Sequence, residues 1–360
     1  MDCDSVRAAC PVRRTITAIL RHPQHHSGAV IAMACLLLLL LGCTAEQRTA
    51  EQQREFIAVE FSFGAEDIEI YHGMELLLNR AIAESGKPIS INYRYAYTDP
   101  DIEASNVAAA LAERPDVLVI MPLDSRTVLE YIRQADDAEI PVIVYNRAAD
   151  PHPQLQPAAF VGLDTVDQAY TTAVGLIQRV IADGKRPKLL NVMGDLRDRN
   201  ALNRNIGLRR AAEETGAEIL ASVETHWIPE LAETGLKNAL ELYPEANSVF
   251  VASDWLMTGV RAALEAGERW VPYGREGHMY IGSQDVFPLG ARLIRDGYVV
   301  VNTSFDIWPM STTLVQSIVS IAAGDELSQR VFLIPGRIVT ARNLDTMGDL
   351  WYRSLDDLSH

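Results

Sequence analysis

An amide and a guanidinium side chain, Asn146 and Arg147, follow directly after a short apolar run. The run, residues 142–145, has the continuously apolar, β-branched character of a buried strand. The two side chains can donate several hydrogen bonds in a fixed geometry, which is what a ring with adjacent hydroxyls needs. The other interpretation is that Arg147 only forms a salt bridge. From these residues alone, a salt bridge at the surface or between two lobes is the favoured interpretation, and a polyol-binding position is the alternative.

Motifs of common enzyme classes are absent from the sequence. It has no glycine-rich nucleotide loop after residues 57–61, no phosphate loop, no His-Glu-x-x-His and no Gly-x-Ser-x-Gly. The histidines beyond residue 43 have no metal-ligand spacing: His72, His152, His226, His278 and His360. We therefore expect a protein that is not an enzyme and uses no cofactor or metal. An enzymatic function would need a nucleophile and a base that no shared motif supplies.

From residue 57 onward, short β-rich runs alternate with longer amphipathic runs. The first set predicts strands at 57–61, 89–97, 117–120, 142–145 and 159–161, and helices at 68–84, 102–112 and 126–135. The second set predicts helices at 168–182, 201–214, 231–242 and 256–266, and strands at 189–192, 219–223 and 249–251. This alternation is typical of βαβ units with parallel sheets. Two sheets of about five strands suit the length better than one.

Several short segments carry a family resemblance in their order along the chain. They are Met121–Ser125, Ile140–Arg147, Asp198–Ala201 with Arg204 and Gly207, Val249–Asp254, Ile281–Gln284 and Val339–Asp345. Together they resemble the type I periplasmic binding proteins for sugars, over nearly all of residues 55–345. The resemblance implies an α/β fold of two Rossmann-like lobes with parallel sheets, joined by a three-stranded hinge, with the ligand in the cleft between the lobes.

The same resemblance implies how the chain divides. The N-terminal lobe is expected at 56–163 and 305–335, and the C-terminal lobe at 164–304 and 336–360. The three crossings are expected near 162–164, 303–305 and 335–337. In open α/β sheets, ligands bind beyond the carboxyl ends of the strands. This rule agrees with the place of Asn146 and Arg147 after a strand.

Further ligand-binding residues are implied by the resemblance. Arg204 occupies the position of the family's second-lobe arginine, and Trp227 that of its ring-stacking aromatic, although core packing is the alternative for Trp227. The remaining candidates are Asn200, Ser253, Asp254, Gln284, Ser62 and Asp67. Four positions depart from the family pattern. Ser253 replaces an asparagine, Gln284 replaces an aspartate with Asp285 beside it, and Glu66 or Asp67 stands where an aromatic is common. The glutamine that is common at a crossing between the lobes is absent from residues 302–306. Trp255 and Trp308 either replace stacking partners or pack in the core.

The N-terminal segment has the parts of a secretory signal. Arginines in the leader precede an apolar stretch that begins near Ala29 and ends in Leu40-Leu41-Gly42-Cys43. This ending resembles the lipobox of bacterial lipoproteins, which implies lipid attachment to Cys43 and removal of residues 1–42. A transmembrane helix is the alternative, but about 15 apolar residues fall short of the roughly 20 that a span needs. Residues 43–55 are polar and are expected to form a tether.

The expected mature chain is strongly acidic. Without the leader it has 28 basic and 46 acidic side chains, a formal charge of −18. Such a surface repels nucleic acid and anionic headgroups. The other three cysteines lie in the leader, so the mature chain has no disulfide.

These observations predict a monomeric, extracytoplasmic solute-binding protein, held at the membrane only by the lipid on Cys43. It would bind a monosaccharide or similar polyol and deliver it to the permease of an ABC importer. The alternative is a ligand-binding partner of a membrane sensor.

Overall fold

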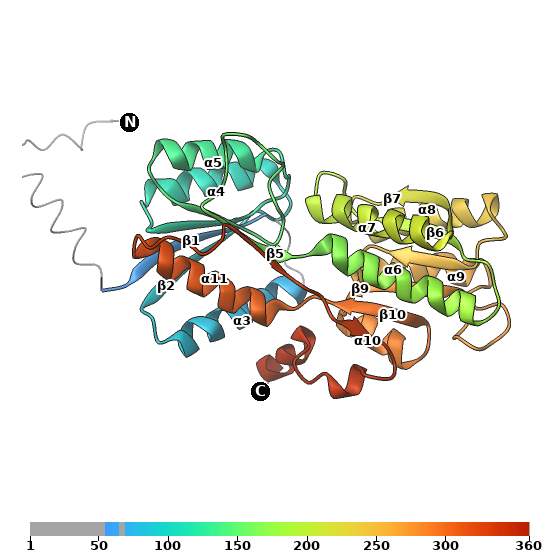
Figure 1. Ribbon diagram of the computed structural model, residues 1–360. Coiled ribbons are helices and arrows are strands. Elements are labelled where there is room, and N and C mark those ends of the chain that lie inside the picture. The colour runs from blue at the N-terminus through green and yellow to red at the C-terminus, as the bar shows by residue number, and fades with distance from the viewer. Residues whose placement is uncertain (1–54, 65–68, 360) are drawn as a thin grey trace, which may run out of the picture. The chain divides into compact units, whose positions relative to one another are not determined.

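The computed structural model describes residues 55–64 and 69–359, so the predicted signal peptide, tether and Cys43 lie outside the described residues. Glu66 and Asp67 also lie outside them. Residues 56–360 form one structural unit, in which two α/β lobes lie side by side (Figure 1). Each lobe contains a six-stranded sheet, one strand more than the approximate number expected. The expectation of two lobes with predominantly parallel sheets is confirmed.

The first lobe is a fully parallel sheet covered by helices on both faces. Its strands follow the order β11 (Val331–Ile334), β5 (Ala159–Leu163), β4 (Val142–Tyr145), β3 (Val117–Met121), β1 (Ile57–Phe63) and β2 (Ile89–Tyr95). One face is covered by α3 (Glu69–Ser85) and α11 (Ile307–Ala322), the other by α4 (Pro100–Ala112) and α5 (Val128–Asp137).

The second lobe repeats this arrangement with one antiparallel edge strand. Its strands follow the order β12 (Ile338–Val339), β10 (Val299–Ser304), β9 (Tyr280–Asp285), β8 (Ser248–Val251), β6 (Lys188–Met193) and β7 (Glu218–Glu224), and β12 runs antiparallel to β10. One face is covered by α6 (Thr165–Ala182) and α7 (Arg199–Thr215), the other by α8 (Pro229–Leu242), α9 (Met257–Ala266) and α10 (Pro288–Arg295).

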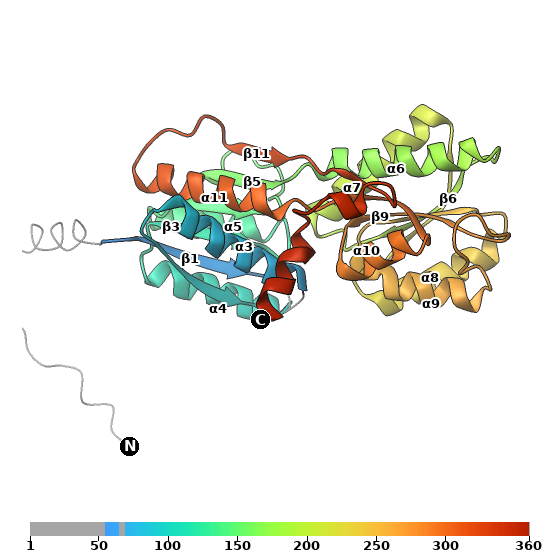
Figure 2. The same cartoon turned by 90° about the horizontal axis from the view of Figure 1, so that it is seen from below.

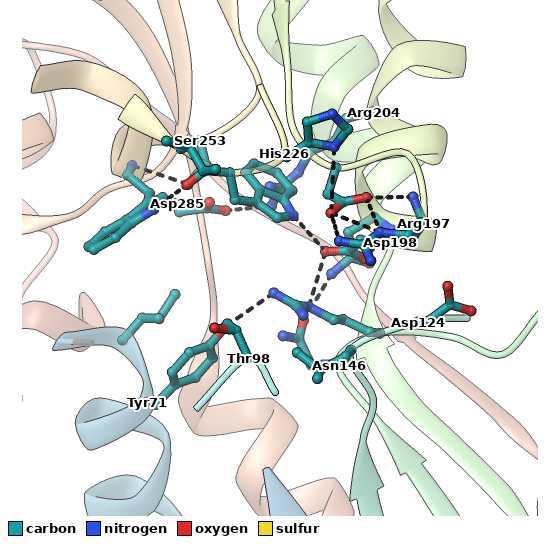
Figure 3. A pocket seen from close by; sticks show the side chains of 18 of the residues that line it. Tyr71, Thr98, Asp124, Asn146, Arg197, Asp198, Arg204, His226, Ser253 and Asp285 are labelled. Atoms are coloured by element: carbon teal, nitrogen blue, oxygen red, sulfur yellow. Dashed lines mark hydrogen bonds and ion pairs between the residues drawn. The ribbon is translucent and has the colours of Figure 1, made fainter. Parts of the chain in front are cut away.

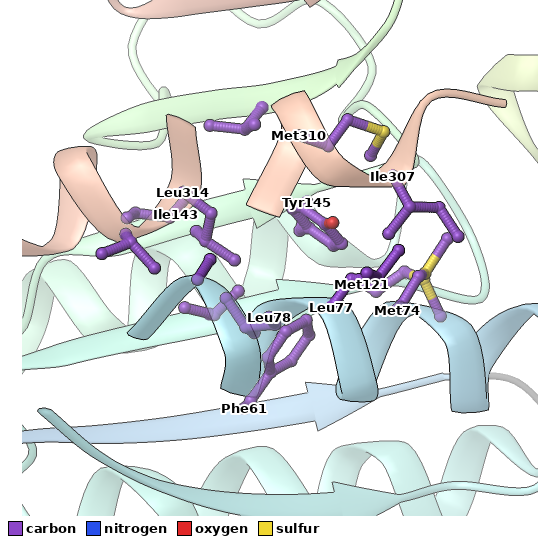
Figure 4. Packing of buried hydrophobic residues seen from close by; sticks show 14 of the residues in the cluster. Phe61, Met74, Leu77, Leu78, Met121, Ile143, Tyr145, Ile307, Met310 and Leu314 are labelled. Carbon is purple, nitrogen blue, oxygen red and sulfur yellow. The ribbon is translucent and has the colours of Figure 1, made fainter. Parts of the chain in front are cut away.

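Central strands are apolar along their whole length because helices cover both of their faces. Every residue of β3 and β4 is buried. Figure 4 shows Phe61, Met121 and Tyr145 of the first sheet packed beneath α3 and α11, which contribute Leu78 and Met310. This packing fixes where the strands end relative to the covering helices. It therefore also fixes the position of the residues that follow the strands.

Three chain segments pass between the lobes and lie together (Figure 2). The first joins β5 to α6, the second joins β10 to α11, and the third joins β11 to β12. The amide N–H of Asp164 donates to the carbonyl of Ile334 at 2.9 Å, and that of Ser304 donates to the carbonyl of Arg337, also at 2.9 Å. The Arg337 guanidinium pairs with Asp306 at 2.7 Å. Hydrogen bonds between the segments thus make the three crossings one connected hinge.

The C-terminal segment contacts both lobes, although we assigned residues 336–360 to the second lobe. The indole of Trp351 is buried against Gly73 of α3, and its Nε1 donates to the carbonyl of Asp285 at 2.8 Å. Trp351 opens the 3-10 helix η3 (Trp351–Ser359), which packs along α3. The preceding 3-10 helix η2 (Leu344–Thr346) contacts α10.

Among the described residues, none of the helices combines the length and the apolar character needed to span a membrane.

Candidate functional site

A cavity of about 520 Å³ lies between the lobes, at the carboxyl ends of both sheets. Its lining comes from both lobes and from Phe305 in the second crossing. Figure 3 shows Tyr71, Thr98 and Asn146 of the first lobe opposite Ser253, His226 and Arg204 of the second. The predicted residues Asn146, Arg147, Asn200, Arg204, Trp227 and Ser253 all line this cavity. Residues far apart in the sequence thus meet where open α/β sheets bind ligands.

Arg147 forms an ion pair across the cavity with Asp198 of the second lobe. The Arg147 Nε and the Asp198 Oδ2 are 3.0 Å apart, and both side chains are largely buried. Arg147 also donates to the Tyr71 hydroxyl at 3.2 Å and to the Pro122 carbonyl at 3.4 Å. Burial lowers the pKa of Arg147, but Asp198 and other anions more than offset it, so the pKa is raised. The guanidinium therefore stays charged, and its contacts fix its orientation in the cavity.

The Asp198 carboxylate joins three structural elements. It is the N-cap of α7, where its Oδ1 accepts from the amide N–H of Asn200 at 2.8 Å. Its Oδ2 accepts from the indole Nε1 of Trp227 at 3.1 Å, besides pairing with Arg147. An N-cap carboxylate satisfies a free N–H of the first helical turn. Asp198 therefore also orients two predicted ligand-binding side chains, those of Arg147 and Trp227.

Further hydrogen bonds connect the lobes directly. The Asn200 amide Nδ2 donates to the Asn146 Oδ1 at 3.1 Å. The Ser125 hydroxyl of the first lobe accepts from the amide N–H of Arg199, the first residue of α7, at 3.0 Å. The Ser125 N–H in turn donates to the carbonyl of Arg197 at 3.1 Å. The lobes therefore contact each other along the N-terminus of α7.

Several cavity residues adopt left-handed backbone conformations. Asn146, Trp227 and Asp285 have φ values of 60°, 62° and 86°. Thr98 and His226, with φ of 63° and 50°, belong to the same group. Left-handed φ values are costly for residues other than glycine, and they concentrate at functional sites. At these strand ends the backbone turns sharply and directs the side chain into the cavity.

Trp227 and Trp255 lie next to each other in the cavity wall. The Trp255 Nε1 donates to the Trp227 carbonyl at 2.8 Å. The Trp227 ring lies so close to Gly194 that an added Cβ would come within 2.2 Å of it. The absence of a side chain at Gly194 therefore makes room for the indole. Trp308, the other tryptophan considered as a stacking partner, is outside this cavity and packs beneath Arg80.

Arg204 lines the cavity, but its guanidinium is bound mainly by other residues of the second lobe. It pairs with Asp285 at 2.6 Å, donates to the Ala252 carbonyl at 2.8 Å, and makes two hydrogen bonds to the Gln168 Oε1. Both members of the Arg204–Asp285 pair are about 4% exposed. The side chain of Arg204 therefore holds Asp285 at the cavity wall.

Three predicted residues lie outside the cavity lining. Ser62 and Gln284 are completely buried, and Asp254 is 2% exposed. The Asp254 carboxylate accepts from the amide N–H of Phe287 and from the Asn302 Nδ2, each at 3.0 Å. Asp254 thus supports the loop that presents Phe287 to the cavity. Asp67 lies outside the described residues.

The sequence comparison decides the family. The profile of the Periplasmic binding protein domain family matches residues 59–326. The chain belongs to this family.

Individual members of the periplasmic binding protein family are distant from this chain. The D-ribose/D-allose-binding protein of Pseudomonas aeruginosa is 23% identical over 251 residues, covering 68% of this chain and 76% of the relative. The ribose import binding protein of Salmonella typhimurium is 24% identical over 199 residues, covering 55% of this chain and 63% of the relative.

A solved structure shares the fold of this periplasmic binding protein. It is the binding component of the arabinose ABC transporter from Shewanella sp. ANA-3, in complex with L-arabinofuranose, with a TM-score of 0.74 and 15% identity. The match covers 84% of this chain and 98% of that one.

The structure adds cavity residues that we did not single out from the sequence. They include Tyr71, Glu103, Asp195, Asp198, His226, Asp285, Phe287 and Phe305. Asp198 lies inside a motif that we quoted, and Asp285 follows the predicted Gln284. Because Asp285 ends β9 with a φ of 86°, it reaches the cavity while Gln284 faces the protein interior.

A second group of titratable side chains lies at the cavity margin. The possible ligand atoms of Asp195, Glu224 and His226 lie within 4.8 Å of one another. Asp195 already pairs with Arg197 at 2.6 Å, and Glu224 accepts from the amide N–H of Leu196 at 3.3 Å. These contacts account for the positions of both carboxylates without an ion.

Asp198→Asn should weaken the contact between the lobes, because it removes the charge that pairs with Arg147. Losing one partner of a buried ion pair typically costs about 3–5 kcal/mol. We expect a longer distance between spin labels at Ile102→Cys on α4 and Leu231→Cys on α8, measured without added ligand. Asp345→Asn, which removes an exposed ion pair with Arg295, is the matched control. Equal distances in both variants would contradict this role of Asp198.

Asp254 should contribute a pH dependence to stability. Burial is the main reason that its pKa is raised to about 7, whereas an unfolded aspartate has a pKa of about 3.9. The folded state then binds more protons between about pH 4 and pH 7, so this contribution to the free energy of unfolding falls as the pH rises. The measurement is urea unfolding of the wild type and of Asp254→Asn at pH 5 and at pH 8. The free energy of unfolding of the wild type minus that of the variant should be lower at pH 8 than at pH 5. A difference that does not vary with pH would refute this.

Proposed function

We propose that this protein captures a sugar or similar polyol outside the cytoplasm by closure of its hinge, and delivers it to an ABC importer. The observation that carries the proposal is the cavity between the lobes, to which both lobes contribute hydrogen-bonding and aromatic side chains. Its volume of about 520 Å³ falls within the range of roughly 300–1,000 Å³ typical of small-molecule sites.

The chemistry of the cavity suits a polyol. Asn146 and Arg147 offer amide and guanidinium donors, and Trp227 offers an indole face that can pack against the C–H side of a ring. The named relatives bind ribose or allose, and the structural neighbour holds arabinofuranose. The resemblance and the lining residues therefore support the same ligand class.

The placement of these residues on both lobes supports closure of the hinge around a ligand. A ligand in the cavity would contact Asn146 and Arg147 on the first lobe and Trp227 and Asn200 on the second. Such a ligand favours the closed form by its differential affinity for the two states. A membrane partner that recognises the relative position of the lobes could then distinguish loaded from empty protein. Arg204 takes part by holding Asp285 in the wall.

The location outside the cytoplasm and the lipid anchor are supported by the sequence. The arginine-containing leader, the apolar stretch and Cys43 have the order of a lipoprotein signal. The acyl chains on Cys43 would keep the protein near the permease, with residues 43–55 as the tether.

Arg147→Ala and Trp227→Ala should each weaken sugar binding. Leaving buried polar partners unpaired costs about 1–3 kcal/mol, so we expect the dissociation constant to rise about fivefold or more. A thermal-shift screen of pentoses, hexoses and polyols identifies the ligand, and calorimetry then measures both variants. Arg261→Ala on α9, whose partner is the exposed Glu265, should leave the affinity unchanged. Near-wild-type affinity in both cavity variants would refute the site assignment.

Cys43→Ser should release the protein from the membrane, because the serine hydroxyl does not accept the diacylglycerol group that the lipobox resemblance implies. The measurement is fractionation of cells that express the wild type or the variant, with mass spectrometry of the N-terminal peptide. We expect an acylated Cys43 in the wild-type membrane fraction and no acylated peptide in the variant. An unmodified Cys43 in the wild type would refute the anchor.

A further inference from the structure

The polar groups of the cavity bind largely to one another. Each of its three arginines pairs with a carboxylate: Arg147 with Asp198, Arg197 with Asp195, and Arg204 with Asp285. The amides of Asn146 and Asn200 bind each other at 3.1 Å. These pairs use some of the donors and acceptors of the lining, such as the Arg147 Nε and the Asn146 Oδ1, so that fewer remain for the hydroxyls of a ligand. The capacity of the described lining to satisfy a fully hydroxylated ring is therefore reduced.

A second part of the cavity lining, called the apolar end below, consists of hydrophobic side chains. Ile70 and Met74 on α3, Phe305 in the second crossing and Phe287 after β9 belong to one buried cluster, and Trp255 packs against it. The rings of Trp255 and Phe287 are 6.4 Å apart. These side chains all line the cavity, and they come from the first lobe, the hinge and the second lobe. Ile70 is the most exposed of the four buried ones, at 6%.

Aliphatic side chains discriminate against hydroxyl groups. An aromatic face can stack on the C–H side of a sugar, but a hydroxyl placed against isoleucine or methionine loses its water without gaining a partner. An apolar substituent at the same place gains about 0.8 kcal/mol for each methylene group removed from water. The two ends of the cavity therefore match different parts of one molecule.

We propose that the ligand is a sugar or cyclitol that carries an apolar substituent, such as a deoxy carbon or an alkyl or aryl aglycone. This inference rests on the proposed function and narrows it. The hydroxylated part lies beside Asn146 and Arg147, and the substituent lies against Ile70, Met74 and Phe305. The cavity volume of about 520 Å³ leaves room for more than one small ring.

The test compares matched pairs of ligands by calorimetry on the full-length protein purified in detergent. The pairs are D-galactose with D-fucose, D-allose with 6-deoxy-D-allose, and D-glucose with phenyl β-D-glucoside. In at least one pair, we expect the substituted member to bind more tightly. The gain should be about fivefold or more for a lost hydroxyl, because the parent hydroxyl would be buried there without a partner. It should be about tenfold or more for the phenyl group, according to the apolar area buried.

Variants at the apolar end locate the effect. Ile70→Thr replaces the ethyl branch of isoleucine with a hydroxyl and so shortens the side chain, and Met74→Gln places an amide in the same wall. Either change should reduce the preference for the substituted ligand, measured as the ratio of the two dissociation constants, at least threefold. Ile181→Gln on α6 is the matched control, because Ile181 is 49% exposed and does not belong to the cavity lining. Thermal unfolding without ligand verifies that each variant is folded.

The possible outcomes distinguish a failure of this inference from a failure of the proposed function. If the parent sugars bind as tightly as their substituted partners, or more tightly, the inference is wrong and the proposed function is supported. If a substituted ligand is preferred but Ile70→Thr and Met74→Gln retain that preference, the assigned position of the substituent is wrong. If no member of any pair binds while a noncarbohydrate ligand does, both the sugar-binding function and the inference fail.

Discussion

The carboxylate of Asp198 is the interaction on which the arrangement of the cavity depends. It caps α7, accepts from the indole of Trp227 and pairs with Arg147 across the lobes. A helix N-terminus and a guanidinium both stabilise a negative charge. Three independent preferences thus converge on one side chain, which explains how a helix of one lobe can position a ligand-binding arginine of the other.

The parallel sheets supply the frame for this junction. All strands of the first sheet point their carboxyl ends toward the cavity, and the same holds for the five mutually parallel strands of the second. The residues after these strands then turn sharply through left-handed conformations, as at Asn146, Trp227 and Asp285. The extensive buried cores on both sides of each sheet offset the free energy that these strained backbone conformations cost. Rigid strands and strained turns together direct side chains into a small volume.

Periodicity predicted the fold because buried parallel strands and amphipathic helices leave distinct patterns, as at residues 142–145 and 168–182. It also placed Asn146 and Arg147 correctly at the end of a strand. It did not distinguish Gln284 from Asp285, because a single left-handed residue at the end of β9 changes which side chain reaches the cavity. The sequence analysis offered a salt bridge of Arg147 as an alternative but did not identify Asp198 as its partner, since that contact joins residues 51 positions apart in different lobes. The local sequence pattern specifies the helices and strands, whereas the contact partner of a cavity side chain depends on how the two lobes pack against each other.

The ion pair between Arg147 and Asp198 bears on how much a ligand can contribute to closure. Arg147 is held by Asp198, Tyr71 and the Pro122 carbonyl, so its guanidinium is oriented before any ligand arrives. Pre-orientation lowers the entropy lost on binding and raises affinity. The same contact, however, already favours contact between the lobes, so part of the closing free energy comes from the protein itself. A ligand shifts the equilibrium only by its differential affinity for the two states. Direct contacts between the lobes therefore raise the affinity for the ligand but reduce the conformational change that the ligand causes.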